Sequence, residues 1–373
     1  MMQQTPSVHP RKVAFVFTSM PVGGAEDFAL GVGPHLAPGY EAHYVCLREF
    51  GRLGEEAKTT GRNVHCVPVF ASRWITPWAV NKFAAWLREQ NISVVHSQTH
   101  HAHVFATKAA RRAGIPSVVH QQKTLEKLPW RRGAILRACL RRASRVVALS
   151  QQTAEDLCRV YGLPADRVSV VPNGIEQTIF KPSEEKRVLR SKLGLPTEGL
   201  LVGTVGRLHE EKNHGAIIGA VAEARRQGAS VNAVFVGEGN LRNQLEHQAR
   251  ESGVSDALIF AGAQRPIVPW LQALDVFALP SMWEGQPLAL LQAIACGIPA
   301  LASNIEGNTA VLGSNHPGLF SPGDHARLAQ LLVTASRDPV FLQQVRDFQT
   351  KVEVPWADKS AQKLADLYNE LLS

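Results

Sequence analysis

Short apolar segments alternate with longer amphipathic segments along most of the chain, which is the pattern of β-strands followed by α-helices. In the first half, the pattern predicts strands at residues 13–17, 42–47, 64–69, 93–97, 117–121 and 145–150, with helices between several of them, as at 79–89 and 102–113. After residues 168–175 the pattern restarts, with strands at 200–207, 232–239, 257–262, 276–280 and 300–303. Helices of this second series are predicted at 214–227, 241–252, 268–273, 288–296 and 325–336. Repeated strand–helix units predict parallel sheets and the α/β class.

The chain is long enough for two domains of this kind. Its 373 residues exceed one ordinary core, and the break at residues 180–192 contains Pro182 within a charged turn. We therefore expect a first Rossmann-like domain over residues 1–180 and a second over 181–355, facing each other across a cleft. Residues 356–373 carry Leu364, Leu367 and Tyr368 at helical spacing. We expect this last helix to pack back toward the first domain.

Composition indicates a globular protein with an ample core, since 45% of the residues are hydrophobic and 19% are charged. No run of eighteen apolar residues is present, and the polar N-terminus leads directly into a strand without an apolar signal region. The five cysteines are scattered, without metal-ligand spacing. These features predict a cytoplasmic protein with reduced cysteines, and they allow a peripheral position on the inner face of a membrane.

The net charge of +8 is unevenly distributed. Residues 1–180 carry 22 basic and 12 acidic side chains, whereas residues 181–373 carry 18 and 20, which gives +10 and −2. The excess peaks between Arg131 and Arg145, where six arginines occur without an acid. Such a segment is either a solvated helix face or a contact for anionic lipid or an acidic substrate. Nucleic acid is the least favoured partner, because no nucleic-acid-binding motif accompanies the arginines.

Two stretches of the first half end strands and contain candidate ligand-binding residues. Gly23 and Gly24 precede a helix, where backbone N–H groups can approach a phosphate or a sugar. The third glycine of a dinucleotide-binding fingerprint is missing nearby, which argues against a nicotinamide cofactor. Residues 94–103 end another strand and hold four histidines, with either a substrate contact or a metal as their role: His96, His100, His101 and His103.

Two stretches of the second half have the chemistry of a diphosphate site. Arg207 and Lys212 flank one loop after a strand, and both could reach a single diphosphate. Glu284 follows a later strand, and residues 285–288 offer backbone N–H groups at a helix start. If most of the span from Glu284 to Gln292 is helical, these two residues are roughly 10–12 Å apart. This is about the distance between the sugar and the ribose of a nucleotide-sugar.

Taken together, these blocks resemble the large retaining glycosyltransferase family 4, which has the GT-B fold. The resemblance runs from Val13 to about Ser373. It rests on five blocks in order, namely PVGGAE, VVPNGIEQTIFKP, GRLHEEKNH, VFVGEGNLRNQLE and PSMWEGQPLALLQAIACGIPALAS.

The resemblance implies a role for each matching residue. Gly23 and Gly24 would lie near the donor phosphate and the acceptor, and Arg207 and Lys212 would bind the diphosphate. Glu284 would bind the transferred sugar as a catalytic residue, and His101 would be the substrate-contacting histidine. Gln98 stands where the family often has the second histidine of H-x-H. The remaining donor contacts would be Gly285, Gln286, Pro287, Leu288 and Gln292, the last replacing the family's ribose-binding glutamate.

The implied reaction is transfer of a sugar, with retention, from a nucleotide-sugar to an acceptor. A UDP-sugar is the favoured donor and a GDP-sugar the second, with no metal and no other cofactor. The basic first half favours a lipid-linked or surface-polysaccharide acceptor, as in lipopolysaccharide assembly. Two alternatives stay open: a sugar-nucleotide epimerase of the same fold, and a non-catalytic nucleotide-sugar-binding homologue.

Overall fold

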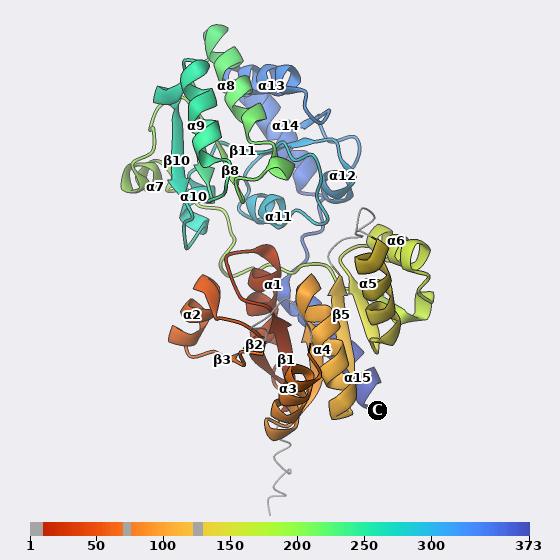
Figure 1. Cartoon of the computed structure of the whole chain (residues 1–373). Helices are drawn as coiled ribbons and strands as arrows, with labels where there is room; N and C mark the ends of the chain where they lie inside the picture. The colour runs from red at the N-terminus through yellow and green to blue at the C-terminus, as the bar shows by residue number, and fades with distance from the viewer. Residues whose placement is uncertain (1–9, 70–75, 122–129) are drawn as a thin grey trace, which may run out of the picture. The chain divides into compact units, whose positions relative to one another are not determined.

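The computed structural model describes residues 10–69, 76–121 and 130–373. The chain forms two compact units (Figure 1). The first unit contains Met1–Glu176 together with Pro355–Ser373, and the second contains Gln177–Val354. The division thus lies four residues before the expected boundary at 180/181, and the last helix belongs to the first unit.

The first unit contains a parallel sheet in the order β3-β2-β1-β4-β5-β6-β7. Its strands are β1 (Arg11–Phe17), β2 (Tyr40–Cys46), β3 (Asn63–Cys66), β4 (Ile92–Ser97), β5 (Ser117–Gln121), β6 (Arg145–Ala148) and β7 (Val168–Val170). Most side chains of the central strands β1, β4 and β5 are buried on both faces, as the continuous apolar runs predict. Phe15 faces one layer of helices, and its neighbours Ala14 and Val16 face the other.

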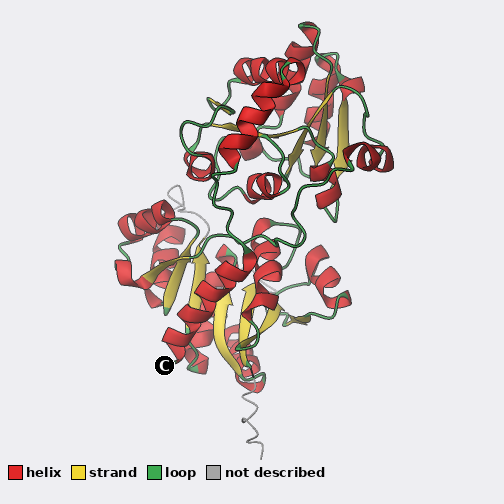
Figure 2. Ribbon diagram, turned by 180° about the vertical axis from the view of Figure 1, so that it is seen from behind, coloured by secondary structure: helices red, strands yellow, loops and turns green. Residues whose placement is uncertain are grey.

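Helices cover both faces of this sheet (Figure 2). One core contains Phe15 and residues of α1 (Gly24–Val32), η1 (Gly33–Leu36) and α15 (Ala357–Leu372). The cores on the opposite face contain residues of α3 (Pro77–Glu89), α4 (His100–Ala113), α5 (Trp130–Arg142) and α6 (Gln151–Tyr161). The shorter elements are α2 (Gly51–Thr59) and η2 (Ala165–Arg167). Helix α15 is joined to the end of the first half by a backbone bridge between Ile175 and Trp356.

The second unit contains a parallel sheet in the order β10-β9-β8-β11-β12-β13. Its strands are β8 (Leu200–Val205), β9 (Val231–Val236), β10 (Leu258–Gly262), β11 (Val276–Leu279), β12 (Ala300–Ser303) and β13 (Leu319–Phe320). Its helices are α7 (Lys186–Leu193), η3 (Glu210–Lys212), α8 (Gly215–Arg226), α9 (Arg242–Glu251), η4 (Ser255–Ala257), α10 (Val268–Gln272), α11 (Leu288–Ala295), α12 (Glu306–Leu312), α13 (His325–Arg337) and α14 (Pro339–Gln349).

The predicted strands match the observed ones in place and order, but several extend too far at their carboxyl ends. The predicted strands at 200–207 and 232–239 end instead at Val205 and Val236, and the glycine and charged residues that follow leave the sheet as loops. Strand β13 was not predicted, because two paired residues carry too short a pattern. The expected linker at 180–192 is wrong in part, since it contains α7. That helix is anchored to the second unit by Arg190, whose guanidinium donates to Asp275 Oδ2 at 2.6 Å.

Candidate active site

The site in the second unit lies at the carboxyl ends of β8 and β11. Strand β8 lies between two neighbours in the sheet. One neighbour is β9, the next strand in sequence, and the other is β11. Strand order reverses at this point, and open α/β sheets bind ligands at such reversals. The loop after β8 carries Arg207 and Lys212, and the loop after β11 carries Ser281 and Glu284. The fold therefore brings the two predicted diphosphate-site stretches together.

Lys212 and Glu284 form the central contact of this site. The ammonium Nζ lies 2.6 Å from Glu284 Oε1, and the Glu284 side chain is only 8% exposed. The Ser281 hydroxyl donates to the same oxygen at 2.6 Å and is itself fully buried. A carboxylate in this position is held by one cation and one hydroxyl, so its direction is fixed before any ligand binds.

The loop that carries Glu284 is fixed by further hydrogen bonds. Met282 N donates to Glu211 O at 2.8 Å, which joins the loop after β11 to the loop after β8. Ser303 Oγ donates to Ser281 O, and Asn308 Nδ2 donates to Ser303 O at 2.9 Å. Ser281, Ser303 and Asn308 are each fully buried. This chain of bonds connects β12 and α12 to the Glu284 loop.

Helix α12 approaches the same loop closely. A Cβ placed on Gly307 would lie 2.4 Å from the carbonyl oxygen of Glu284. This distance is far below van der Waals contact, so a side chain at position 307 would displace the Glu284 backbone. Glycine is required here for close approach and not for its conformational freedom, because its backbone lies within a helix.

Arg207 lies on the same loop as Lys212 but contacts a different residue. Its guanidinium NH2 is 3.0 Å from Glu211 Oε1, and its side chain is 68% exposed. The structure therefore places both predicted cations at the carboxyl edge of the sheet without a shared partner. Arg207 can leave its exposed ion pair at little cost, since such pairs contribute about 0–1 kcal/mol.

Helix α11 begins at Leu288 with Pro287 before it. Of the predicted N–H donors at 285–288, Pro287 therefore offers none, because proline lacks an amide hydrogen. The sequence-based separation between Glu284 and Gln292 assumed helix over most of that span, which is wrong for residues 284–287. Gln292 lies in the second turn of α11 with 7% of its surface exposed.

The loop after β9 packs directly on the loop that bears Arg207. A Cβ on Gly237 would lie 1.9 Å from Gly206 O, and one on Gly239 would lie 2.2 Å from Leu208 O. Leu208 N also donates to Glu238 O at 2.9 Å. The two glycines of GEG therefore shape the backbone beside Arg207, a role that their spacing alone did not indicate.

In the first unit, the corresponding strand reversal lies between β1 and β4. The loop after β1 leads to Gly23 and Gly24 at the start of α1, and the loop after β4 leads to His101 in the first turn of α4. The two loops touch, since Thr18 N donates to Thr99 Oγ1 at 3.3 Å. His101 is exposed and available to a ligand. Gly24 is exposed at the helix N-terminus, which favours negative charge.

The four histidines of residues 94–103 do not all converge, because the His100 ring lies near those of His101 and His103, with centroids 5.6 and 6.4 Å away, whereas His96 contacts Tyr368. His96 is fully buried, with Nδ1 2.6 Å from the Tyr368 hydroxyl, and His103 is buried with Nδ1 2.9 Å from Ser97 Oγ. Burial lowers the pKa of both imidazoles well below the ordinary value. Within the described ranges, no group of three or more His, Cys, Asp or Glu side chains is arranged to hold a metal ion.

Sequence reasoning did not find Ser281, Ser303, Asn308 or Gly307. Small polar residues and glycine are frequent in every loop, so neither their type nor their spacing distinguishes them. It also missed His120 on β5, which is fully buried and stacks against His96 with ring centroids 5.4 Å apart. Burial lowers the pKa of His120 to about 3.

Two family models together match most of the chain. Residues 22–178 match Glycosyltransferase Family 4, and residues 185–352 match Glycosyl transferases group 1. The Bacillus subtilis (strain 168) protein named as glycosyltransferase EpsF is 30% identical over 307 residues, which cover 79% of each chain. An Escherichia coli UDP-Gal:alpha-D-GlcNAc-diphosphoundecaprenol alpha-1,3-galactosyltransferase is 29% identical over 301 residues, 77% of each chain.

Solved structures show the same fold at lower sequence identity. Anabaena Alr3699/HepE in complex with UDP and glucose has a TM-score of 0.83 at 21% identity, covering 96% of this chain and 100% of that chain. WaaG, a glycosyltransferase involved in lipopolysaccharide biosynthesis, has a TM-score of 0.70 at 18% identity over 95% and 99% of the two chains. Two parallel-sheet units of this kind are the GT-B fold. The chain is a glycosyltransferase of the group 1 and family 4 type.

Proposed function

We propose that this enzyme transfers a sugar from a UDP-sugar, with retention of anomeric configuration, to a lipid-linked acceptor. The observation that carries the donor half of this proposal is the Lys212–Glu284 pair at the strand reversal of the second unit. Such a pair offers a cation to a phosphate and a fixed acceptor to sugar hydroxyls within one contact.

Lys212 can serve both partners at once. Its ammonium has three N–H donors, and the contact with Glu284 uses one of them. The others can donate to the donor diphosphate, and Arg207 can add a second cation after leaving Glu211. The N-terminus of α11, with the N–H groups of Gly285, Gln286 and Leu288, would bind the remaining phosphate oxygens. Together these groups would stabilise the charge that develops as the diphosphate departs.

The transfer itself needs few protein groups. The acceptor oxygen forms a bond to the anomeric carbon while the bond from that carbon to the diphosphate oxygen breaks. Both events on one face give retention, and the acceptor proton passes to the departing phosphate oxygen. Glu284 would hold the sugar hydroxyls in position, and catalysis would consist mainly of positioning and charge stabilisation. His101 is the proposed substrate contact from the first unit.

The identity of the donor is supported by the relatives. The E. coli relative is named for UDP-Gal, and HepE was solved with UDP and with UDP-glucose. The Gln292 amide would accept from a ribose hydroxyl where the family has a glutamate. A GDP-sugar is the second candidate for the donor.

The acceptor proposal rests on charge and on one relative. The E. coli relative is named for a diphosphoundecaprenol acceptor, which is a lipid carrier. The six arginines from Arg131 to Arg145 would hold the first unit near anionic lipid that contains such an acceptor. Within the described parts of the chain, no helix has both the length and the apolar character needed to cross a bilayer.

The test is incubation of the purified enzyme with labelled UDP- and GDP-sugars, with and without lipid-linked acceptors. We expect UDP release that accelerates with acceptor and persists in EDTA, and an α-linked product from an α-linked donor by NMR. Conversion of the donor to its epimer without acceptor would identify an epimerase, and binding without turnover would identify a non-catalytic homologue. Loss of activity in EDTA, restored by Mg²⁺ or Mn²⁺, would contradict the proposed metal independence.

A further inference from the structure

The helices on one side of the first unit's sheet are strongly basic. Helices α3, α4 and α5 are neighbours on the same side of the sheet. Between them they carry ten Lys and Arg residues, against the single acid Glu89. We call these ten residues the basic face: Lys82, Arg88, Lys108, Arg111, Arg112, Arg131, Arg132, Arg137, Arg141 and Arg142. The excess of charge thus extends well beyond α5.

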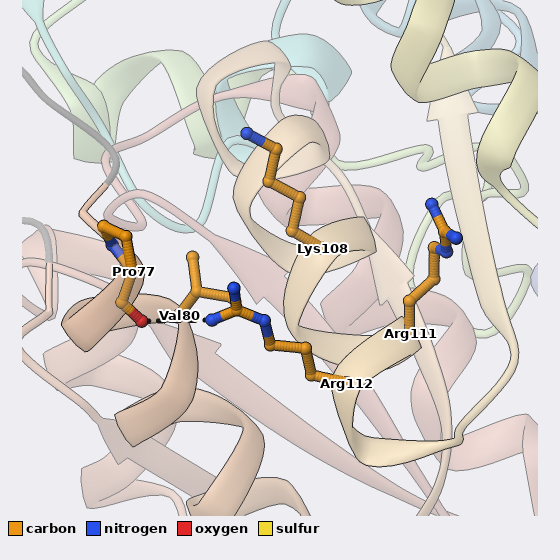
Figure 3. Close-up of a pocket in the computed structure, with 5 residues that line it drawn as sticks. All are labelled: Pro77, Val80, Lys108, Arg111 and Arg112. Atoms are coloured by element: carbon orange, nitrogen blue, oxygen red, sulfur yellow. Dashed lines mark hydrogen bonds between the residues drawn. The ribbon is translucent and has the colours of Figure 1, made fainter.

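A pocket of about 430 Å³ opens within the basic face, between α3 and α4 (Figure 3). It is lined by Pro77 and Val80 of α3 and by three cations of α4, namely Lys108, Arg111 and Arg112. The Arg112 guanidinium is fixed across the pocket, because its NH1 donates to Pro77 O at 3.2 Å and also to Asn81 Oδ1. One wall of the pocket is therefore rigid and positively charged.

In the described part of the chain, the other two cations of the pocket, Lys108 and Arg111, are not held by hydrogen bonds as Arg112 is. Within the described ranges, neither Lys108 nor Arg111 forms a salt bridge or a side-chain hydrogen bond. Both side chains are exposed. Three like charges around one hollow repel one another in the unligated protein. A bound anion would remove this repulsion, and phosphate is well matched to Arg and Lys donors.

Large apolar side chains protrude from the same helices. Trp78 follows Pro77 and is 66% exposed, Trp130 is 76% exposed, and Ile135 is 54% exposed. Both tryptophans lie under cations of the basic face, with Lys82 over Trp78 and Arg131 over Trp130. Tryptophan beside Lys and Arg is the composition of surfaces that lie in the headgroup region of a bilayer. This favours lipid over nucleic acid or an acidic protein as the partner.

We propose that the pocket between α3 and α4 binds the phosphate headgroup of an anionic phospholipid, so that the basic face lies on the bilayer. The inference deepens the proposed function, since it adds a defined lipid site to the general attraction expected of residues 131–145. Attraction of about 1 kcal/mol per basic residue implies that loss of two pocket cations weakens vesicle binding by about 30-fold.

The first experiment compares vesicle co-sedimentation of the full chain on phosphatidylcholine alone and on phosphatidylcholine mixed with phosphatidylglycerol. We expect binding to the mixed vesicles and about a 30-fold loss in the double variant K108A/R111A. The matched control is K192A/R250A, which removes the same charge from exposed positions of the second unit. Equal losses in the two double variants, or no loss in K108A/R111A, would overturn the proposal.

A second experiment separates the pocket from the rest of the basic face. Glycerol phosphate should release wild-type protein from mixed vesicles more effectively than chloride at equal ionic strength. This difference should disappear in K108A/R111A and persist in R131A/R132A, which weakens binding from outside the pocket. Equal effects of the two anions on wild-type protein would rule out a phosphate site. Pocket-dependent binding to single-stranded RNA without vesicle binding would assign the face to a nucleic acid instead.

Calorimetric titration of UDP into the same preparations distinguishes this inference from the proposed function. K108A/R111A should bind UDP as wild type does, because both residues lie outside the donor site. Vesicle binding by a protein that fails to bind UDP would leave the lipid site standing and contradict the donor proposal.

Discussion

Lys212 Nζ lies 2.6 Å from Glu284 Oε1, although 72 residues separate the two in the chain. They meet because β8 and β11 are neighbours in the sheet of the second unit, so the loops at their carboxyl ends adjoin. The pair exists without ligand and is largely shielded from solvent. A site assembled in advance loses little conformational freedom when a donor binds.

The pair predicts different behaviour for Lys212 and Arg207, the two cations proposed to bind the diphosphate. Lys212→Ala should weaken UDP binding by about 1.5–3 kcal/mol, the range for hydrogen bonds to charged groups. It should also lower stability, because it leaves the buried Glu284 carboxylate with Ser281 as its remaining side-chain donor. Arg207→Ala should weaken UDP binding by a similar amount and leave stability unchanged, since Arg207 is mostly exposed.

Calorimetric titration with UDP and thermal unfolding of both variants measure these effects. Lys212→Met, which keeps the aliphatic chain and removes the charge, serves as the control for lost packing. Undiminished UDP binding in both alanine variants would refute the diphosphate assignment. Equal stability losses in both would show that the Lys212–Glu284 pair has no structural role.

Ser281 is predicted to be a positioning residue for Glu284. Ser281→Ala removes one of the two side-chain donors to Oε1, so the carboxylate becomes less well directed. We expect kcat to fall by about tenfold, as for loss of one hydrogen bond to a charged group of about 1.5 kcal/mol. KM for the donor should change less, because Lys212 remains in place. Ser281→Thr should restore kcat if the hydroxyl is what matters, whereas a purely structural role would lower melting temperature in Ser281→Ala without this rescue.

Gly307 offers a test of the close approach between α12 and the Glu284 loop. Alanine usually stabilises a helix interior by about 0.5–1 kcal/mol relative to glycine. Gly307→Ala should instead destabilise and reduce activity, because the new Cβ would lie 2.4 Å from Glu284 O. Gly31→Ala in α1 is the matched control, since a Cβ there meets no atom within 4 Å. A stabilised and active Gly307→Ala enzyme would contradict the predicted clash.

The sheets could be predicted from the sequence because buried parallel strands consist of continuous apolar residues. The runs at β1 and β8, for example, mark the first strand of each unit correctly. Their carboxyl ends could not be located, because residues such as Gly206 and Gly237 leave the sheet through packing between loops. Helix α7 was missed because it has only a short apolar stripe, Leu189 and Leu193, and is otherwise held by ion pairs of Lys186 and Arg190 with Asp275.

The positions of the candidate site residues could be predicted only where charge and spacing carried the information. Arg207, Lys212 and Glu284 were found as charged residues after strands, and the structure places them at one edge of the second sheet. That Lys212 binds Glu284 follows from strand order, which no local pattern encodes. Spacing alone could not separate the histidines of residues 94–103, because His96 and His103 point into different cores on opposite faces of β4 whereas His101 is exposed.

The buried histidines predict loss of stability in mild acid. Burial lowers the pKa of His120 to about 3, whereas an unfolded histidine has a pKa of about 6.5. Below pH 6.5 the unfolded chain therefore binds a proton that the folded unit does not. The free energy of unfolding should fall by about 1.4 kcal/mol per pH unit for each such histidine until the folded pKa is reached.

Thermal unfolding followed from pH 7.5 to pH 5 measures this slope. His120→Leu removes one titrating group from the core of the first unit, so that unit's transition should depend less steeply on pH than in wild type. Two observations would count against the buried neutral imidazole: identical pH dependence in both proteins, or greater stability of the wild-type first unit at pH 5 than at pH 7.

The last prediction concerns Gln292, the proposed ribose contact, which the resemblance places where the family has a glutamate. If its amide accepts a hydrogen bond from ribose, Gln292→Ala should weaken UDP binding by about 0.5–1.5 kcal/mol, the net value of a neutral hydrogen bond. Gln292→Glu should strengthen binding, because a charged acceptor makes the stronger bond. The structure adds a condition, since only 7% of the Gln292 surface is exposed. A carboxylate there is poorly solvated without ligand, so Gln292→Glu should have a lower melting temperature than wild type. Added UDP should raise that melting temperature by more than it raises the wild-type value. Calorimetric titration and thermal unfolding with and without UDP separate this from simple packing within α11. If Gln292→Ala melts earlier but binds UDP as wild type does, the side chain is structural and another group binds the ribose.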